Sequence, residues 1–414
     1  QWDERTWTLE GFLGASHIRG ESEVITAAQR APYRYFQRPD ADHLEVDPAR
    51  TSLSGFSGEF ALSKRVGRHW EGAATLGTIS PGYDVNDLGF MRRTDRTDLW
   101  LELGYSETRP GDVLRSYFLN ATYLTEHNYD WQNISDRVFL NSFFQFLNYW
   151  NGNIGVTLGL PGTVDDRLTR GGPAADRPGY WTLFTRLGSD ARRTVVGDVG
   201  SVFQRDRAGG HFWNLFADVL VKPAPNWEFS IGPSLLRAHD VAQYLMAVPD
   251  PLASATFGTR YVFAELDQTV SALDVRLNYT FMPGLSFQLY AQPFIASGAF
   301  GPPKQFAAPG TFDFLVYGRD IGVVSGDTIY PDGRYDGAPS FRAPEPDFNL
   351  RSLRGNAVLR WEWRPGSTLY LAWQQVRQDF ASTGDFELGR DAGALFEAEP
   401  DDIFLVKVNY WLNP

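Results

Sequence analysis

The amino-acid sequence predicts an all-β fold, a transmembrane antiparallel up-and-down β-barrel of about 18 strands with short periplasmic turns and long extracellular loops. Apolar and polar residues alternate with a period of two through most of the 414 residues, and aromatic residues make up 15% of the chain. The mean hydropathy is −0.31, and the absence of any run of about 18 apolar residues excludes a transmembrane helix. A membrane barrel is still allowed, because only alternate residues of its strands face lipid.

The clearest predicted strand covers residues 273–281, where the odd positions are apolar and the even positions include Asp274, Arg276 and Asn278. After a three-residue turn at 282–284 the same alternation resumes, which predicts a β-hairpin. The same pattern predicts further strands around residues 98–106, 113–123, 154–160, 213–221, 359–363, 368–374 and 404–412.

The predicted connections alternate between short and long, as they do in transmembrane barrels. Short turns fall near residues 67–68, 109–111, 151–152, 189–190, 223–225, 282–284 and 364–366. Long loops cover about 20–50, 81–94, 128–135, 161–179, 298–350 and 379–400. Two further candidate strands at 239–268 alternate poorly, so the expected count is about 18 with them and about 16 without them.

A soluble propeller or stacked sandwich also alternates, so the period alone does not decide the class. Three features favour the membrane. The apolar stripes reach the length that crosses a bilayer, no repeat with a blade motif is present, and tryptophans lie near strand ends, where aromatic girdles form. Those tryptophans are Trp7, Trp70, Trp150, Trp181, Trp227, Trp363 and Trp411.

Charge and composition exclude several classes of function. The net charge of −12 argues against a nucleic-acid partner, which requires basic patches. There is no cysteine, so disulfides, thiolate metal sites and cysteine nucleophiles are excluded. No histidine lies in a recognisable catalytic motif, so we expect no enzymatic activity and no catalytic residues. The histidines are His17, His43, His69, His127, His211 and His239.

We expect residues 1–414 to form one outer-membrane barrel domain whose inward face carries the candidate functional residues. In a wide barrel these side chains could select solutes, or they could pair across neighbouring strands and hold the wall rigid. The predicted lumen-lining residues are Glu102, Asp274, Arg276, Gln288, Gln292, Arg354, Asn356, Arg360, Glu362 and Lys407.

The longest loop, 298–350, is expected to fold over or into the lumen, because a structureless loop of this length is uncommon. Its large apolar and aromatic residues are Phe306, Phe312, Phe314, Leu315, Val316, Tyr317, Tyr330 and Tyr335. A short helix is expected at 386–396. In the loop at 161–179, four charged residues could lock the loop by ion pairs or form an eyelet over the pore: Asp165, Asp166, Arg167 and Arg170.

No cofactor is predicted apart from a candidate Ca²⁺ site at Asp84, Asn86 and Asp87. A second acidic run contains Asp327, Asp332 and Asp336. Neither run has the EF-hand spacing, and Asx-turns account for both with fewer assumptions.

Several stretches of the chain resemble one uncharacterised bacterial family of outer-membrane barrels. They are residues 35–43, 80–90, 168–173, 260–264, 290–294, 348–356 and 388–391. The family is a domain of unknown function, usually found C-terminal to a carbohydrate-binding family-nine-like module. The resemblance implies a location in the bacterial outer membrane and a link to surface glycans, but it supplies no catalytic residues. The family's sugar-binding-like module is missing from this chain, which opens at Gln1. We therefore expect an export signal, and an upstream domain that either was cleaved or lies outside this chain.

Two functions are compatible with these patterns. The first is a porin-like or plugged barrel for the passage of small solutes, with sugars as candidates. The second is a membrane anchor or docking platform for a partner protein or for the missing N-terminal carbohydrate-binding-like domain. The expected partners are outer-membrane lipid, a glycan or small solute, and that partner protein or domain, with no nucleic acid.

Overall fold

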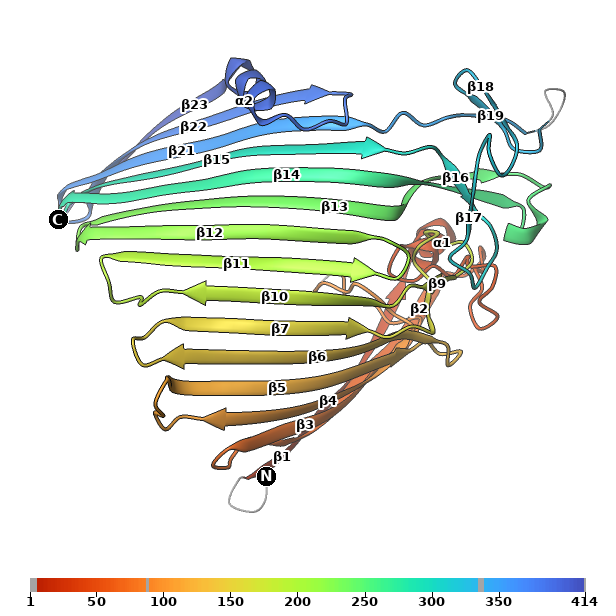
Figure 1. Ribbon diagram of the computed structural model, residues 1–414, viewed down its shortest axis with the longest axis horizontal. Coiled ribbons are helices and arrows are strands. Elements are labelled where there is room, and N and C mark those ends of the chain that lie inside the picture. Colours follow the sequence, from red (N-terminus) through yellow and green to blue (C-terminus); the bar gives the residue numbers. More distant parts are fainter. Residues whose placement is uncertain (1–5, 87–88, 334–338, 413–414) are drawn as a thin grey trace.

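The computed structural model describes residues 6–86, 89–333 and 339–412, and one antiparallel sheet of 18 strands dominates it (Figure 1). Sixteen of these strands follow one another as a meander in which each strand pairs with the next long strand. They are β1 (Trp7–Arg19), β2 (Ser52–Lys64), β3 (Trp70–Ile79), β4 (Arg96–Glu107), β5 (Leu114–His127), β6 (Asn133–Phe146), β7 (Asn151–Gly159), β10 (Tyr180–Gly188), β11 (Val195–Asp206), β12 (His211–Ala224), β13 (Trp227–Pro249), β14 (Thr259–Met282), β15 (Leu285–Phe300), β21 (Phe348–Arg364), β22 (Ser367–Ala381) and β23 (Asp401–Asn409).

The remaining elements lie in the connections. Two short strands, β16 and β17, extend the sheet from β14, and the others form a hairpin and a separate three-stranded sheet. The short elements are α1 (Ser22–Arg30), β8 (Thr163–Asp165), β9 (Ala175–Arg177), η1 (Ser254–Thr256), β16 (Lys304–Phe306), β17 (Phe314–Val316), β18 (Val323–Ser325), β19 (Thr328–Tyr330), β20 (Phe341–Arg342) and α2 (Leu388–Glu397). No helix among the described residues is both long and apolar enough to span a membrane.

The strand count of 18 agrees with the prediction, although two of the strands are not the expected ones. Region 239–268 does not form an extra pair of strands; it continues β13 and β14 beyond their neighbours. The register of β13 shifts between Asp240 and Gln243 and again between Tyr244 and Met246. Such bulges move successive side chains to the other face, which explains why the alternation fails there.

Long and short connections are segregated, as predicted. The short turns lie at one end of the strands, and the chain termini lie toward that end (Figure 1). The long connections, with α1 and the small sheets, lie at the other end, as does the short connection at 207–210. Helix α2 folds back over the strands (Figure 1).

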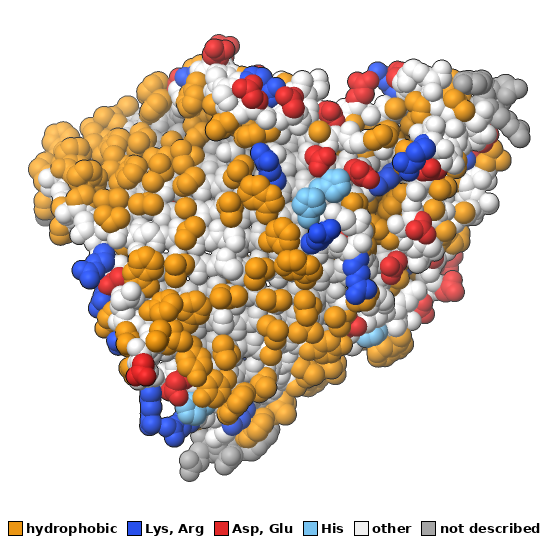
Figure 2. Space-filling model, viewed as in Figure 1, with side chains coloured by type: hydrophobic (Ala, Val, Ile, Leu, Met, Phe, Trp, Pro, Cys, Tyr) orange, Lys and Arg blue, Asp and Glu red, His pale blue; other side chains and the backbone are white. Residues whose placement is uncertain are grey.

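The two faces of the curved sheet differ in chemistry. Directly opposed residues of an antiparallel pair lie on the same face. Leu289 pairs with Leu277 and Ala357, whereas the neighbouring Tyr290 pairs with Arg276. The apolar set forms the convex face, and Figure 2 shows its hydrophobic side chains spread over the strands.

Apart from α2 and its flanking residues, which lie over part of β11–β15, no second layer covers the apolar face among the described residues. Leu13 on β1 is 77% exposed, Leu215 on β12 is 51% exposed and Phe404 on β23 is 76% exposed. The buried hydrophobic clusters lie instead at the long-connection end: one around Ile25 and Phe36, one around Phe263 and Phe306, and a third around Ile329.

The first and last strands are the two edges of the sheet. Within the described residues, β1 pairs only with β2, and β23 pairs only with β22. The closed barrel expected from the sequence is therefore not formed by hydrogen bonds between β1 and β23. All nine residues of β23 are exposed.

Candidate functional site

The polar face brings most of the predicted lumen-lining residues together on adjacent strands. The pairing register puts Arg276 opposite Tyr290, and Tyr290 opposite Asn356. Gln292 lies opposite Arg354 on the same face. The other predicted residues on these strands are Asp274, Gln288, Arg360 and Glu362. Glu102 lies apart on β4, and Lys407 lies on the edge strand β23.

An open hollow of about 420 Å³ lies on this part of the polar face. Beside it, the Asp274 carboxylate accepts hydrogen bonds from the Tyr290 hydroxyl at 2.9 Å and from Gln292 Nε2 at 3.2 Å. The Arg276 guanidinium lies 5.2 Å from the centre of the Tyr290 ring. The residues that line the hollow are Arg276, Asn278, Gln288, Leu289, Tyr290, Asn356 and Val358.

Some charges of the polar face are neutralised locally and others are not. Arg360 forms a salt bridge with Glu362 of its own strand at 2.7 Å and donates across to the Tyr370 hydroxyl of β22, as expected for a wall held by cross-strand contacts. Neither Arg276 nor Arg354 forms a salt bridge with any residue that the structure describes. Both side chains are exposed on the polar face.

Acidic residues gather on the opposite edge of the sheet. By register, Glu10, Glu59, Glu71 and Glu102 lie on the polar face of β1–β4. Glu102 accepts a hydrogen bond from Asn120 at 2.6 Å. The polar face therefore carries negative charge on its first strands. On β14–β23 both signs are interspersed, with the basic Arg276, Arg354, Arg360 and Lys407 beside the acidic Asp274, Glu362 and Asp401.

Four long connections meet at one end of this face, and we call them the cap: residues 20–51, 80–95, 160–179 and 301–347, apart from those outside the described ranges. They leave the sheet between β1 and β2, β3 and β4, β7 and β10, and β15 and β21. Because these strands are spread along the whole sheet, contacts among the connections bridge its curvature.

The ion pairs of the cap centre on Asp166. This carboxylate pairs with Arg93, with Arg38 at 3.5 Å and with Arg167 at 3.8 Å. Burial of Asp166 opposes ionisation, but the adjacent Arg93 and the other two guanidinium groups outweigh it and hold the pKa of Asp166 below its usual range. Three connections thus share one buried charge.

Further contacts tie the cap together. Arg34 donates to Asp84 at 2.7 Å, and Asp40 accepts the backbone N–H of Ala174 at 2.7 Å. The backbone N–H of Gly310 donates to the carbonyl of Ala174 at 2.8 Å. The Phe314 ring of the longest connection packs 5.2 Å from Phe263 of β14. The predicted long loop therefore packs against the 160–179 connection and the end of β14.

The four charged residues predicted for the 161–179 loop all have partners, three of them within the cap, while Arg170 contacts β13. Asp165 accepts the backbone N–H of Arg167 at 2.9 Å and pairs with Arg177 at 3.2 Å. Arg170 lies 4.4 Å from the centre of the Tyr244 ring. These contacts fit the interpretation that the loop is locked. The partners Arg34, Arg38, Asp40 and Arg93 were missed from the sequence, because they lie tens of residues away along the chain and share no motif.

The candidate calcium residues have other partners. Asp84 pairs with Arg34, and its second oxygen accepts the backbone N–H of Asn86 at 2.9 Å, which is an Asx-turn. Asp87 and Asp336 lie outside the described residues. Among the residues that are described, no three or more His, Cys, Asp or Glu side chains cluster as metal ligands do.

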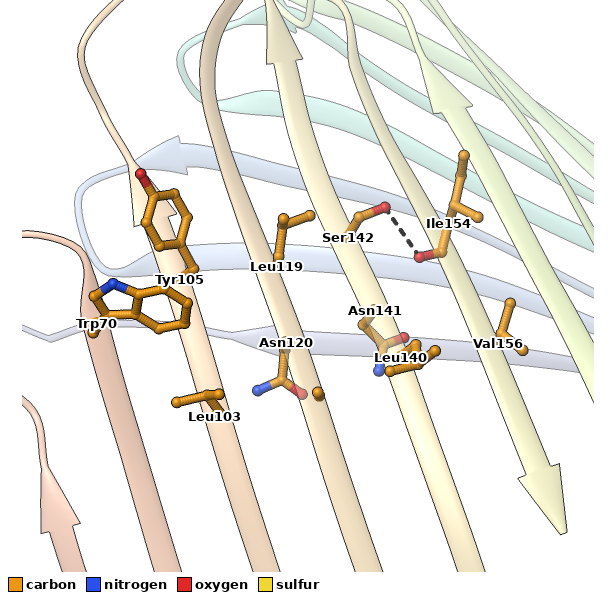
Figure 3. Close-up of a pocket in the computed structure, with 11 residues that line it drawn as sticks. Trp70, Leu103, Tyr105, Leu119, Asn120, Leu140, Asn141, Ser142, Ile154 and Val156 are labelled. Atoms are coloured by element: carbon orange, nitrogen blue, oxygen red, sulfur yellow. Dashed lines mark hydrogen bonds between the residues drawn. The ribbon is translucent and has the colours of Figure 1, made fainter. Parts of the chain in front are cut away.

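The apolar face has two hollows of its own. One, of about 420 Å³, crosses β3–β7 (Figure 3) and is lined mainly by Trp70, Leu103, Tyr105, Leu119, Leu140, Ile154 and Val156. The other, of about 670 Å³, lies between α2 and strands β11–β15. Beneath α2, the buried Asp391 accepts hydrogen bonds from Arg351 at 2.8 Å and Arg390 at 2.9 Å. The sequence predicted the helix but not this ionic anchor.

Comparison with known proteins gives a family but no activity. A family model described as a domain of unknown function (DUF5916) matches residues 27–413. No curated protein matches the chain. The NanC porin, solved in a rhombohedral crystal form, matches at 9% sequence identity and a TM-score of 0.22, covering 67% of this chain and 94% of the porin. A TM-score this low carries no argument about function.

Proposed function

The chain belongs to the family described as a domain of unknown function (DUF5916), and because that description assigns no activity, we propose a function from geometry alone. In this proposal the sheet closes into a barrel that spans the bacterial outer membrane. Its polar lumen is a porin-like passage for small solutes, and the cap restricts that passage at the long-connection end. The proposal assigns no chemical reaction to the chain.

The uncovered apolar face is the observation that carries this proposal. Soluble monomers rarely expose a contiguous apolar patch larger than a few hundred Å², whereas this face extends over the long strands and is covered only in part, by α2, among the described residues. Lipid is the solvent that such a face requires.

Aromatic side chains at the short-turn end support the same placement. Trp70 packs on Tyr105 with ring centres 4.9 Å apart. Further along the same rim, Trp361 packs on Trp363 at 6.1 Å, and Trp227 on β13 contacts its neighbour on β14. Trp and Tyr are enriched where a barrel wall meets the membrane interface.

Closure follows from the requirements of a membrane. An unpaired strand edge exposes N–H and C=O groups that find no partner in hydrocarbon. β1 leaves the short-turn end and β23 returns to it, so the two edges would meet as antiparallel neighbours. Their polar faces carry Glu10 and Lys407, neither of which has a salt-bridge partner among the described residues, and closure would allow these two to pair.

A closed sheet of this many strands leaves an aqueous channel unless something fills it, and the cap is placed to do so. The test is single-channel conductance in a planar bilayer, comparing the full chain with a variant that lacks residues 303–345. The deletion removes β16 and the Phe314 contact with β14, so we expect conductance to rise.

A matched control deletes residues 383–399 at the same rim. This segment carries α2, which contacts β21 and β22 and lies against the apolar face, so its removal should leave conductance unchanged. Unchanged conductance after the 303–345 deletion would contradict the restricted passage.

A docking platform for a partner protein is the second candidate, and one observation favours it. Apolar side chains are exposed in the long connections, with Phe90 at 83% and Trp131 at 75%. Exposed aromatic residues are typical of protein interfaces. Unchanged conductance after the cap deletion would make this candidate the better one.

A further inference from the structure

We infer that the hollow on strands β14, β15 and β21 binds a small organic anion that carries a carboxylate and several hydroxyl groups, as an acidic sugar does. The inference rests on the proposed passage and names the class of solute that the passage selects.

Two arginines supply the positive charge. Arg276 on β14 and Arg354 on β21 flank β15, and neither forms a salt bridge with a described residue. Arg276 lies level with Asn356, and Arg354 is two residues further along β21, so two strand spacings and two residues separate the two backbones by about 12 Å. Arg276 lines the hollow and Arg354 lies just beyond its lining, and two long side chains can reach one anion from these positions. Guanidinium groups bind carboxylates with paired hydrogen bonds, so a planar anion suits them.

The residues between the arginines fix the geometry of the hollow. The Asp274 carboxylate holds the Tyr290 hydroxyl at 2.9 Å and the Gln292 amide at 3.2 Å. The carboxylate accepts from these neutral donors and forms no salt bridge with Arg276 among the described residues, while its negative charge stays two residues from Arg276 on the same face. The Arg276 guanidinium stacks 5.2 Å from the Tyr290 ring, which holds it beside the hollow.

Amide groups supply the partners for hydroxyls. Asn278, Gln288 and Asn356 all line the hollow and are exposed on the polar face. Each amide offers both donors and an acceptor, as a hydroxyl group requires. The volume of about 420 Å³ lies in the range of small-molecule sites, roughly 300–1,000 Å³.

The charge of the remaining polar face confines an anion to this place. Glu10, Glu59 and Glu71 lie on the first three strands and form no salt bridge with described residues. An anion in the lumen is repelled by these strands and attracted by Arg276 and Arg354, as side-chain charges select ions in other pores.

The test is equilibrium binding of D-glucuronate to the full chain in detergent, which does not require an open passage. We expect Arg276→Gln and Arg354→Gln each to weaken binding severalfold, and the double variant by about tenfold or more, because hydrogen bonds to charged groups are strong. Arg205→Gln is the matched control, since register places Arg205 on the opposite face and its loss should leave the affinity unchanged.

Two further probes define the class. Glucose, which lacks the charge, should bind at least tenfold more weakly than glucuronate. Equal binding of glucose and glucuronate would refute the claim that the ligand must be an anion. Tighter binding of glucose 6-phosphate than of glucuronate would refute the claim that the charged group is a carboxylate. Absence of glucuronate binding in a chain that conducts would overturn the site and leave the proposed function standing. Binding without conductance would instead count against the passage alone.

Discussion

Asp166 joins arginines from three connections of the cap, so its charge is shared by segments far apart in the sequence. We expect Asp166→Asn to loosen the cap, because it leaves Arg38, Arg93 and Arg167 without their common anion. Breaking a buried pair costs about 3–5 kcal/mol, and the loss should lower the local opening free energy by about that amount. Hydrogen exchange of the cap amides measures it.

The control for this substitution is Asp165→Asn. Asp165 is more exposed than Asp166, and its one salt bridge within the described ranges is with Arg177. Asparagine keeps an oxygen that can accept the backbone N–H of Arg167, so the effect should be below about 1 kcal/mol. Equal exchange rates in the two variants would contradict a central role for Asp166.

The assignment of faces makes a prediction for two neighbouring residues of β14. Leu277 lies on the apolar face between Phe229 and Leu289, whereas Asn278 lies on the polar face opposite Gln288. We expect Leu277→Arg to destabilise the chain by about 2–4 kcal/mol, because it puts a charge toward lipid. Asn278→Arg should cost far less. Equal shifts in a denaturant titration in lipid vesicles would show that the faces are assigned wrongly.

Helix α2 is fastened to the sheet by a buried acid, which gives its docking a dependence on pH. Burial opposes ionisation of Asp391, but hydrogen bonds from Arg390, from the backbone of Glu387 and from Arg351 outweigh it and lower the pKa of Asp391 to about 2. A carboxyl group with a lowered pKa stabilises the docked state above its unfolded pKa of about 3.9. That contribution is lost as the pH falls from about 4 toward 2.

A spin label at Gly393→Cys reports this docking cleanly, because the chain has no other cysteine. We expect the label to become mobile between about pH 4 and pH 2. In the Asp391→Asn background it should be mobile at neutral pH as well. A label that stays immobile throughout would contradict the ionic anchor.

The elements show what alternation can and cannot predict. The β14–β15 hairpin was predicted from period-two alternation, and helix α2 was predicted at 386–396 and found at Leu388–Glu397. Region 239–268 was misjudged because bulges in β13 break the period. Helix α1 was not predicted at all; it lies inside a segment expected to be a loop.

The hollow and the cap also differ in how far the sequence predicts them. The polar residues of the hollow follow from alternation alone, since period two places Asp274, Arg276 and Asn278 on one face. The cap could not be predicted, because Asp40 meets Ala174 across 134 residues. Sequence patterns describe near neighbours, and such pairings depend on the completed sheet.

The molecule as a whole is a curved sheet with an apolar outside, a polar inside and a core confined to one end. The passage requires that the two edges of the sheet meet, whereas the anion site lies on β14, β15 and β21, away from both edges. In β1 the apolar face includes Leu9, and in β23 it includes Phe404, Val406 and Val408. Pairing of Glu10 with Lys407 would put Leu9 near Val408.

Disulfide cross-linking between β1 and β23 tests closure most directly, in a chain that has no native cysteine. Leu9→Cys is combined in turn with cysteine at Phe404, Val406 and Val408 in lipid vesicles. Leu9→Cys with Leu62→Cys is the positive control, because these residues are directly opposed on β1 and β2. We expect an intramolecular disulfide in one register, most efficiently with Val408→Cys. If the control pair cross-links and no β1–β23 pair does, the barrel is not closed and the proposed passage fails.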